Sequence, residues 1–220
     1  MTQHHRARRK IRRISYQEFR NAVTDDACCA GSGGDMATTL ATIIARTVTG
    51  TKPAEALDEL LSQGEGTPVH GVWHHALIGE LLLVCLRNAG HPIADEIIDE
   101  VVDRGRQIPG GSCGFLGTCG ALQSAASAYA ILLGSTPVAT RPRESLLAFS
   151  SRLIARLAEI GGSRCCKKSS YVAVEVASDQ LAKLGFELPE ERLEGRCRFF
   201  ASNETCDGDA CPYYPRKRSG

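Results

Sequence analysis

The chain has 220 residues, of which 43% are hydrophobic, and its formal net charge is +1 at pH 7. This length fits one large or two small globular domains, with enough apolar residues to bury a core without covalent cross-links. Neither an apolar run approaching the roughly 18 residues of a membrane span nor a secretory signal is found, because the basic N-terminus lacks an apolar segment. The sequence therefore predicts a cytoplasmic protein with no membrane contact.

The near-neutral charge conceals two basic ends. Residues 1–13 contain six Lys or Arg and no acidic residue, and residues 216–218 add three more. The remaining 17 basic residues stand against 25 acidic ones, so the middle of the chain is acidic. Our preferred interpretation is that residues 1–14 form a disordered, solvated arm. The alternative is that the basic ends bind nucleic acid or another acidic partner.

The composition includes ten cysteines. Because cytoplasmic thiols stay reduced and a chain of this size needs no disulfides, the cysteines indicate metal binding or thiol chemistry. Cys85 lies in an apolar run and is predicted to be an ordinary core residue. The other nine lie near glycines or in the C-terminal tail: Cys28, Cys29, Cys113, Cys119, Cys165, Cys166, Cys197, Cys206 and Cys211.

The first part of the chain, up to residue 63, is predicted to form three helices. A capping-box pattern predicts a short helix over residues 15–23, and apolar periodicity predicts helices over 36–47 and 53–63. A glycine-rich loop between the first two contains Cys28 and Cys29. This pair is a candidate catalytic thiol pair, acting as a sulfur carrier or redox switch, or an additional cluster ligand. Two ordinary thiols without a role are the alternative.

Three histidines, His70, His74 and His75, open a long apolar helix predicted over residues 70–88. If the helix already begins at His70, then His70 and His74 share a face. Each histidine is a candidate catalytic acid or base, ligand or substrate contact; the alternative is that backbone or water satisfies them. A zinc-protease motif is excluded, because Gly71 follows His70 where that motif needs glutamate.

An amphipathic helix with acids on its wet face is predicted over residues 92–108. Earlier in the chain, Glu80 is either a buried acid or a residue that faces solvent. Residues 109–125 then place Cys113 and Cys119 among glycines, ahead of a helix predicted to begin near residues 117–120. The positive end of that helix favours thiolates, and glycines let backbone approach a bulky group. The candidate cofactor contacts here are Gly111, Gly114 and Gly117.

The same arrangement recurs in residues 161–171, GGSRCCKKSSY. A linker is predicted over residues 134–143, a helix over 144–160, and another helix from about 170 to 184. Positive neighbours and the helix dipole are expected to depress the pKa values of Cys165 and Cys166. The candidate cofactor contacts of this loop are Gly162 and Arg164.

The C-terminal tail, residues 196–220, is polar and contains Cys197, Cys206 and Cys211. Such a segment is hard to order without a metal or a disulfide, and a Cys-Pro step like that at Pro212 also occurs in ferredoxin-type cluster sequences. One more helical turn is predicted over residues 190–193. The predicted architecture is a compact all-α domain over residues 15–195, with a metal-binding tail packed on it.

Seven cysteines are candidate metal ligands, and a [4Fe–4S] iron–sulfur cluster is the favoured cofactor. Structural zinc is the alternative, but it usually uses more closely paired cysteines than these. Since adjacent residues point in different directions, Cys165 and Cys166 are expected to serve different sites. The sequence leaves open which of the two joins the tail cysteines and which joins the remaining ligands. The seven candidates are Cys113, Cys119, Cys165, Cys166, Cys197, Cys206 and Cys211.

Taken together, the motifs HGVWHH, GGSCGFLGTCGA, GGSRCCKKSSY and C…C…CPYYP resemble a family of cysteine-rich prokaryotic domains of unknown function. The resemblance covers roughly residues 60–215 and implies that these motifs form one site, but it implies no particular reaction.

Three functions follow as hypotheses. The favoured one is a cluster-dependent enzyme that transfers sulfur or makes or breaks C–S bonds, with a small sulfur-containing substrate and a sulfur or electron donor protein as partners. The second is a redox or sensing protein without turnover. The third is a zinc-stabilised interaction domain whose basic ends bind nucleic acid.

Overall fold

A computed structural model describes residues 42–43, 45–63 and 70–216. Within these residues every regular element is helical, and no strand is present, which confirms the all-α prediction. None of these helices combines the length and apolarity that crossing a membrane requires. The elements are α3 (Pro53–Gln63), α4 (Trp73–Asn88), α5 (Asp95–Arg106), α6 (Ser112–Phe115), α7 (Gly120–Leu133), α8 (Thr140–Ile160), α9 (Cys166–Ala182), η1 (Phe200–Ser202) and η2 (Gly208–Ala210).

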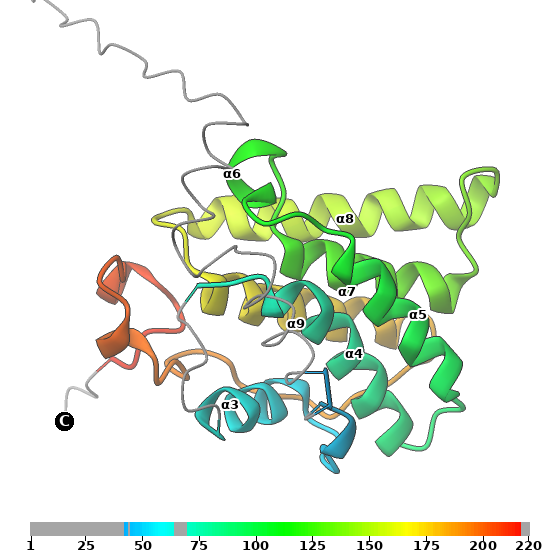
Figure 1. Ribbon diagram of the computed structural model, residues 1–220, viewed down its shortest axis with the longest axis horizontal. Coiled ribbons are helices and arrows are strands. Elements are labelled where there is room, and N and C mark those ends of the chain that lie inside the picture. Colours follow the sequence, from blue (N-terminus) through cyan, green and yellow to red (C-terminus); the bar gives the residue numbers. More distant parts are fainter. Residues whose placement is uncertain (1–41, 44, 64–69, 217–220) are drawn as a thin grey trace, which may run out of the picture.

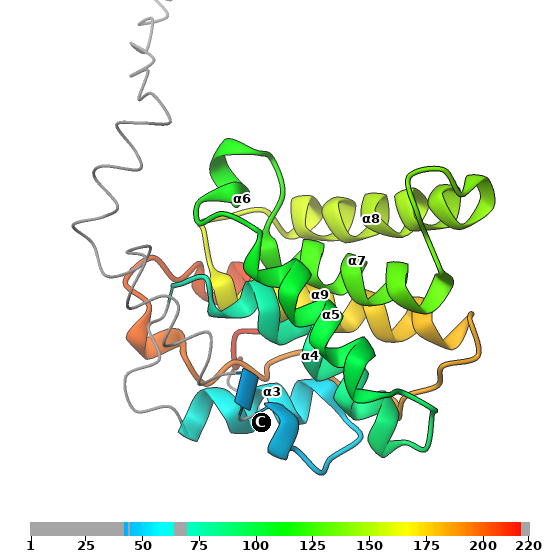
Figure 2. The same cartoon turned by 45° about the vertical axis from the view of Figure 1, so that its right-hand side comes forward.

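Helix α4 is the centre of the bundle. It is apolar on all sides, and every residue from Trp73 to Leu86 is buried, which includes Cys85 as predicted. A helix with no polar face is stable only when other elements surround it. Helices α5, α7, α9 and α3 all contact α4, and α8 lies outermost over α7 and α9 (Figures 1 and 2).

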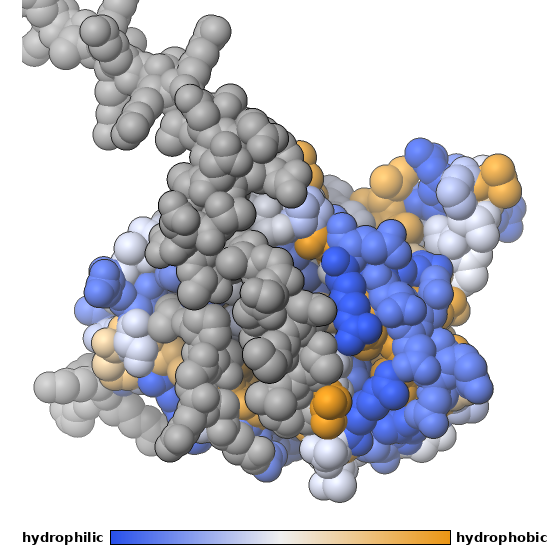
Figure 3. Space-filling view, viewed as in Figure 1, coloured by the Kyte–Doolittle hydropathy of each residue, from blue (hydrophilic) through white to orange (hydrophobic). Residues whose placement is uncertain are grey.

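Close helix contacts depend on small residues. The amide of Gly79 in α4 donates a hydrogen bond of 2.8 Å to Ser124 Oγ in α7. A Cβ on Gly79 would lie 2.7 Å from the Ser124 carbonyl oxygen, so only glycine fits without movement of the neighbouring helix. On the outer side of α5, hydrophilic side chains cover the surface (Figure 3), as the predicted wet face requires.

Several helix boundaries differ from the sequence prediction. Helix α8 begins at Thr140, inside the predicted linker, because Pro142 falls in the first turn, where its missing N–H is tolerated. Helix α9 begins at Cys166, four residues before the predicted start, and α4 begins at Trp73, so His70 precedes the helix. The short helix α6 was not predicted.

The predicted turn over residues 190–193 is absent from the structure. Glu191 instead accepts hydrogen bonds from the backbone amides of Ala54 and Glu55, at 2.8 and 2.9 Å. These are free amides of the first turn of α3, so Glu191 caps that helix from a distant part of the chain. The chain after α9 therefore returns along the bundle in extended form to the end where α9 begins (Figure 1).

Glu80 is fully buried, which settles the choice left open by the sequence. Its Oε1 lies 3.4 Å from Arg46 Nε. Burial raises the pKa of Glu80 to about 8, although the charges of Arg46 and Arg106 act in the opposite direction. The folded protein therefore keeps this proton at pH values where the unfolded chain has lost it.

Stability is expected to fall between about pH 4.5 and pH 8, because in this range only the unfolded state releases the Glu80 proton. Glu80→Gln removes this loss, so the variant should gain on the order of a few kcal/mol over wild type from pH 5 to pH 8.5. Urea denaturation at both pH values measures the gain. The exposed Glu96→Gln is the control, and a pH-independent difference for Glu80→Gln would contradict the prediction.

Candidate functional site

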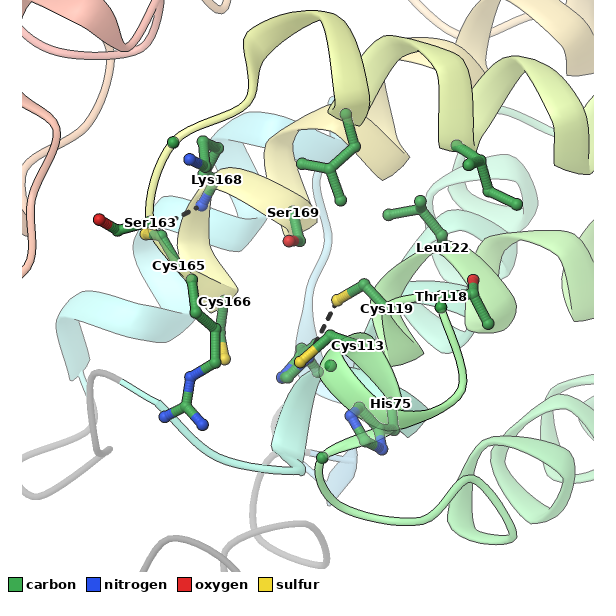
Figure 4. A pocket seen from close by; sticks show the side chains of 18 of the residues that line it. His75, Cys113, Thr118, Cys119, Leu122, Ser163, Cys165, Cys166, Lys168 and Ser169 are labelled. Carbon is green, nitrogen blue, oxygen red and sulfur yellow. Dashed lines mark hydrogen bonds between the residues drawn. The ribbon is translucent and has the colours of Figure 1, made fainter. Parts of the chain in front are cut away.

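The candidate site is a cavity of about 410 Å³ lined by cysteines and glycines, here called the main pocket. It lies between α6, the start of α7, the second half of α8 and the loop before α9 (Figure 4). Four cysteines line it, Cys113, Cys119, Cys165 and Cys166, and His74 lies beside Cys119. The apolar part of its lining consists of Leu122, Ile154, Leu157 and Ala158.

The close contact in the main pocket joins Cys119 and His74. Cys119 Sγ lies 3.6 Å from His74 Nε2, and both side chains are buried. Cys119 is also the residue that precedes the first turn of α7. Cys113, from α6, is exposed, so it is the cysteine of this pocket that solvent reaches most easily.

A second, smaller cavity lies between the start of α9 and the C-terminal tail, and it is called the tail cavity here. Its free volume is about 20 Å³, and four cysteines line it together. Desolvation and neighbouring thiols both raise the pKa of Cys197, to about 11; those neighbours are Cys165, Cys211 and Cys206. The four cysteines of the tail cavity are Cys165, Cys197, Cys206 and Cys211.

The adjacent Cys165 and Cys166 have different contacts. Cys165 Sγ accepts the backbone amide of Lys168 at 3.4 Å and so caps α9, whereas Cys166 Sγ lies 3.9 Å from the carbonyl oxygen of Gly71. Figure 4 shows the two sulfurs pointing apart. Cys165 lines both cavities and Cys166 only the main pocket. Cys166 therefore lies with Cys113 and Cys119 alone, whereas Cys165 is the cysteine of the pair that also lies with those of the tail.

Burial, and not the helix dipole, dominates the thiol pKa values. Desolvation raises the pKa of Cys166 to about 12 and also raises that of Cys119 and Cys211. The expectation of a depressed pKa at Cys166 and Cys119 was therefore wrong. The dipole argument assumed exposed sulfurs, while these lie in apolar surroundings that penalise the charged form.

The histidines have different environments. His75 Nδ1 lies 3.0 Å from the carbonyl oxygen of Ile108, and a Cβ on Gly120 would come within 2.0 Å of the His75 ring. Backbone therefore satisfies and holds His75, which fits the structural alternative for this residue. Desolvation lowers the pKa of His74 well below its ordinary value, so its imidazole is neutral near pH 7. His70 is half-buried and lies before α4.

The glycines of the two loops have different surroundings: those before α7 border the main pocket, and Gly162 packs against the tail. Gly111, Gly114 and Gly117 line or border the main pocket, and a Cβ on Gly114 or Gly117 would meet no atom within 4 Å. The backbone of Gly162, in contrast, packs closely against Asp207 of the tail. A Cβ there would lie 2.4 Å from Asp207 Oδ2, and the backbone angle φ is +78°.

Asp207 fastens the tail to the start of α9. Its carboxylate accepts the Ser163 amide at 2.8 Å and the Lys168 ammonium at 2.7 Å. Lys168 Nζ also donates to the carbonyl oxygen of Gly161 at 2.5 Å. The tail is attached further along by Tyr213, whose hydroxyl donates to Glu175 Oε2 at 2.5 Å. The tail cavity is therefore built across two segments that specific polar contacts hold together.

Sequence reasoning missed the buried lysines. Lys167 and Lys168 are 3% and 4% exposed, although they were considered only as positive neighbours of the cysteines. Their position directly after two candidate ligands was the available signal, but nothing local indicates that such long charged side chains are buried. The apolar wall of the main pocket was also missed, because its residues come from two helices that the sequence alone does not bring together.

Metal binding requires the ligands to move closer than they lie here. Across residues 42–43, 45–63 and 70–216, no three His, Cys, Asp or Glu side chains are already gathered tightly enough to hold one metal ion. The two groups of cysteines share cavities, and thiols are suitable donors for zinc and iron. Cys28, Cys29 and the predicted basic N-terminal arm lie outside the described residues. Arg164 lines the main pocket.

Comparison with known proteins gives a family but no characterised relative. A search of curated proteins finds no match, and neither does a search of solved structures. A family model, described as "Family of unknown function (DUF5714)", matches residues 41–214, and this range includes both cavities. The chain therefore belongs to this family of unknown function.

Proposed function

We propose that this protein is an iron–sulfur enzyme that acts on a small sulfur-containing compound in the main pocket. The observation that carries the proposal is the meeting of Cys113 in α6, Cys119 just before α7 and Cys166 at the start of α9 around one cavity of about 410 Å³, which Cys165 also lines. Cavities of this size are typical of small-molecule sites. A carrier protein that donates sulfur or electrons is the partner that such chemistry needs.

The ligands in this proposal are Cys113, Cys119 and Cys166. Three protein thiolates would leave one iron of a [4Fe–4S] cluster open, and such an iron supplies Lewis-acid binding of a substrate sulfur. His74, with Nε2 at 3.6 Å from Cys119 Sγ, orients that ligand and shields it from water. Each thiol must lose its proton to bind metal, so the raised pKa values make metal loading more favourable at higher pH.

The apolar wall suits the carbon part of the substrate. Leu122, Ile154 and Leu157 line the same cavity as the cysteines, and burial of a hydrocarbon against them contributes about 25 cal/mol per Å². Ile154 is 43% exposed without a ligand. The pocket thus combines sulfur-binding groups with an aliphatic surface, which favours a thiol, thioether or persulfide with an aliphatic chain.

A second candidate concerns the tail cavity. Its four cysteines could fill all four positions around one metal ion. Its volume of about 20 Å³ suits a single ion better than a cluster. This favours structural zinc at Cys165, Cys197, Cys206 and Cys211, with a [4Fe–4S] cluster as the competing occupant. If zinc were the only metal of the protein, the interaction-domain hypothesis would replace the enzyme.

The test is the metal content of full-length protein purified without oxygen. We expect brown protein with iron, acid-labile sulfide and a broad absorption band in the visible blue, and we expect added sulfide to change that spectrum. Cys85→Ala serves as the control, because Cys85 lies outside both cavities and should leave the spectrum unchanged. Colourless protein containing zinc alone, or no metal, contradicts the iron–sulfur proposal.

A further inference from the structure

Lys167 is a buried cation at the tail cavity. Its side chain lines this cavity with the four cysteines, and the residue is only 3% exposed. The ammonium lies over the Trp73 ring, 4.3 Å from the centroid, and over the Phe199 ring, 4.7 Å from the centroid. The two rings hold the charge in place and keep water away from it, and cation–π attraction offsets part of the desolvation cost.

No carboxylate among the described residues forms an ion pair with Lys167. Its neighbour Lys168 differs, since that ammonium pairs with Asp207 at 2.7 Å. The groups that share the tail cavity with Lys167 and can carry negative charge are the thiols of Cys165, Cys197, Cys206 and Cys211 and the carboxyl group of Asp207, which pairs with Lys168. A buried charge without a counter-charge is costly, so this lysine requires an anion nearby.

We propose that Lys167 is the built-in counter-charge of an anionic metal–thiolate centre held by Cys165, Cys197, Cys206 and Cys211. Four thiolates around Zn²⁺, or around the oxidised core of a [4Fe–4S] cluster, carry a net charge of about −2. The inference rests on the metal binding proposed above and adds a positioning residue that acts through its electric field. In this dry environment one positive charge has a large effect on a nearby anion.

The test compares Lys167→Met with wild type in the metal-loaded, full-length protein. We expect a chelator to remove the tail metal about tenfold faster from the variant, because the anionic centre loses its counter-charge. If the tail centre is an iron–sulfur cluster, its midpoint potential should also shift to more negative values. Lys167→Arg, which keeps the charge, should restore most of both properties, and the exposed Lys183→Met should behave as wild type.

The experiment distinguishes failure of the proposed metal site from failure of the proposed role of Lys167. Wild-type protein that binds no metal at the tail cysteines overturns the metal site and this inference together. A tail metal that leaves Lys167→Met no faster than wild type, with an unchanged potential where one is measurable, overturns the inference alone. A structural role for Lys167 predicts lower stability in both Lys167 variants without recovery of metal retention by arginine, and that result would also contradict the proposal.

Discussion

Cys165→Ser and Cys166→Ser are expected to remove different metal centres, although the residues are adjacent. Cys165 lines the tail cavity with Cys197, Cys206 and Cys211, while Cys166 is buried in the main pocket. Serine is a poor ligand for the soft metals that thiolates select. Each substitution should therefore abolish binding at its own site and largely preserve the other, with substrate-induced spectral changes lost only in Cys166→Ser.

Double variants show which cysteines share a centre. Adding Cys206→Ser to Cys165→Ser should cause no further loss of metal, because one site cannot be lost twice. Adding Cys119→Ser to Cys165→Ser should remove the second centre as well. Iron, zinc and sulfide per chain are the quantities to measure. The reverse pairing, with Cys166 non-additive with Cys206, would assign the adjacent cysteines the other way and contradict the arrangement described here.

The second prediction is a large loss of stability when Gly105 in α5 is replaced by alanine. A Cβ there would lie 2.3 Å from the carbonyl oxygen of His75 and 2.6 Å from the Cα of Ala76. Both atoms belong to the backbone of α4, so no side-chain rotation relieves the clash and the two helices must separate. Gly105→Ala should lower the free energy of unfolding by about 3 kcal/mol, even though alanine favours a helix more than glycine does.

Urea denaturation of Gly105→Ala measures this loss, with Gly50→Ala as the matched control. A Cβ on Gly50 meets no atom within 4 Å, so the control should change stability by about 0.5 kcal/mol or less. Because His75 lines the main pocket, Gly105→Ala should also weaken binding of sulfide to the loaded protein. Unchanged stability would show that α4 and α5 separate easily, contrary to the close contact seen here.

Local sequence patterns predicted most helices because the information for them is local. The apolar spacing and Pro53 predicted α3 with its observed bounds, and the glycines before residue 120 predicted the start of α7. The errors have one distant and one local cause. Residues 190–193 form no helix because Glu191 caps α3, and α9 starts early because the Cys165 side chain already caps it.

For the candidate site, the sequence by itself determined which residues carry the chemistry: the cysteines, the glycine-rich loops and the histidines before α4. It also predicted that the side chains of the adjacent Cys165 and Cys166 point in different directions. Only the tertiary structure decided that Cys165 joins the tail and Cys166 the main pocket, and that Lys167 is buried between Trp73 and Phe199. The physical reason is that burial and partner choice depend on separate segments, 95 residues apart in the case of Cys166 and Gly71, whose approach no local pattern encodes.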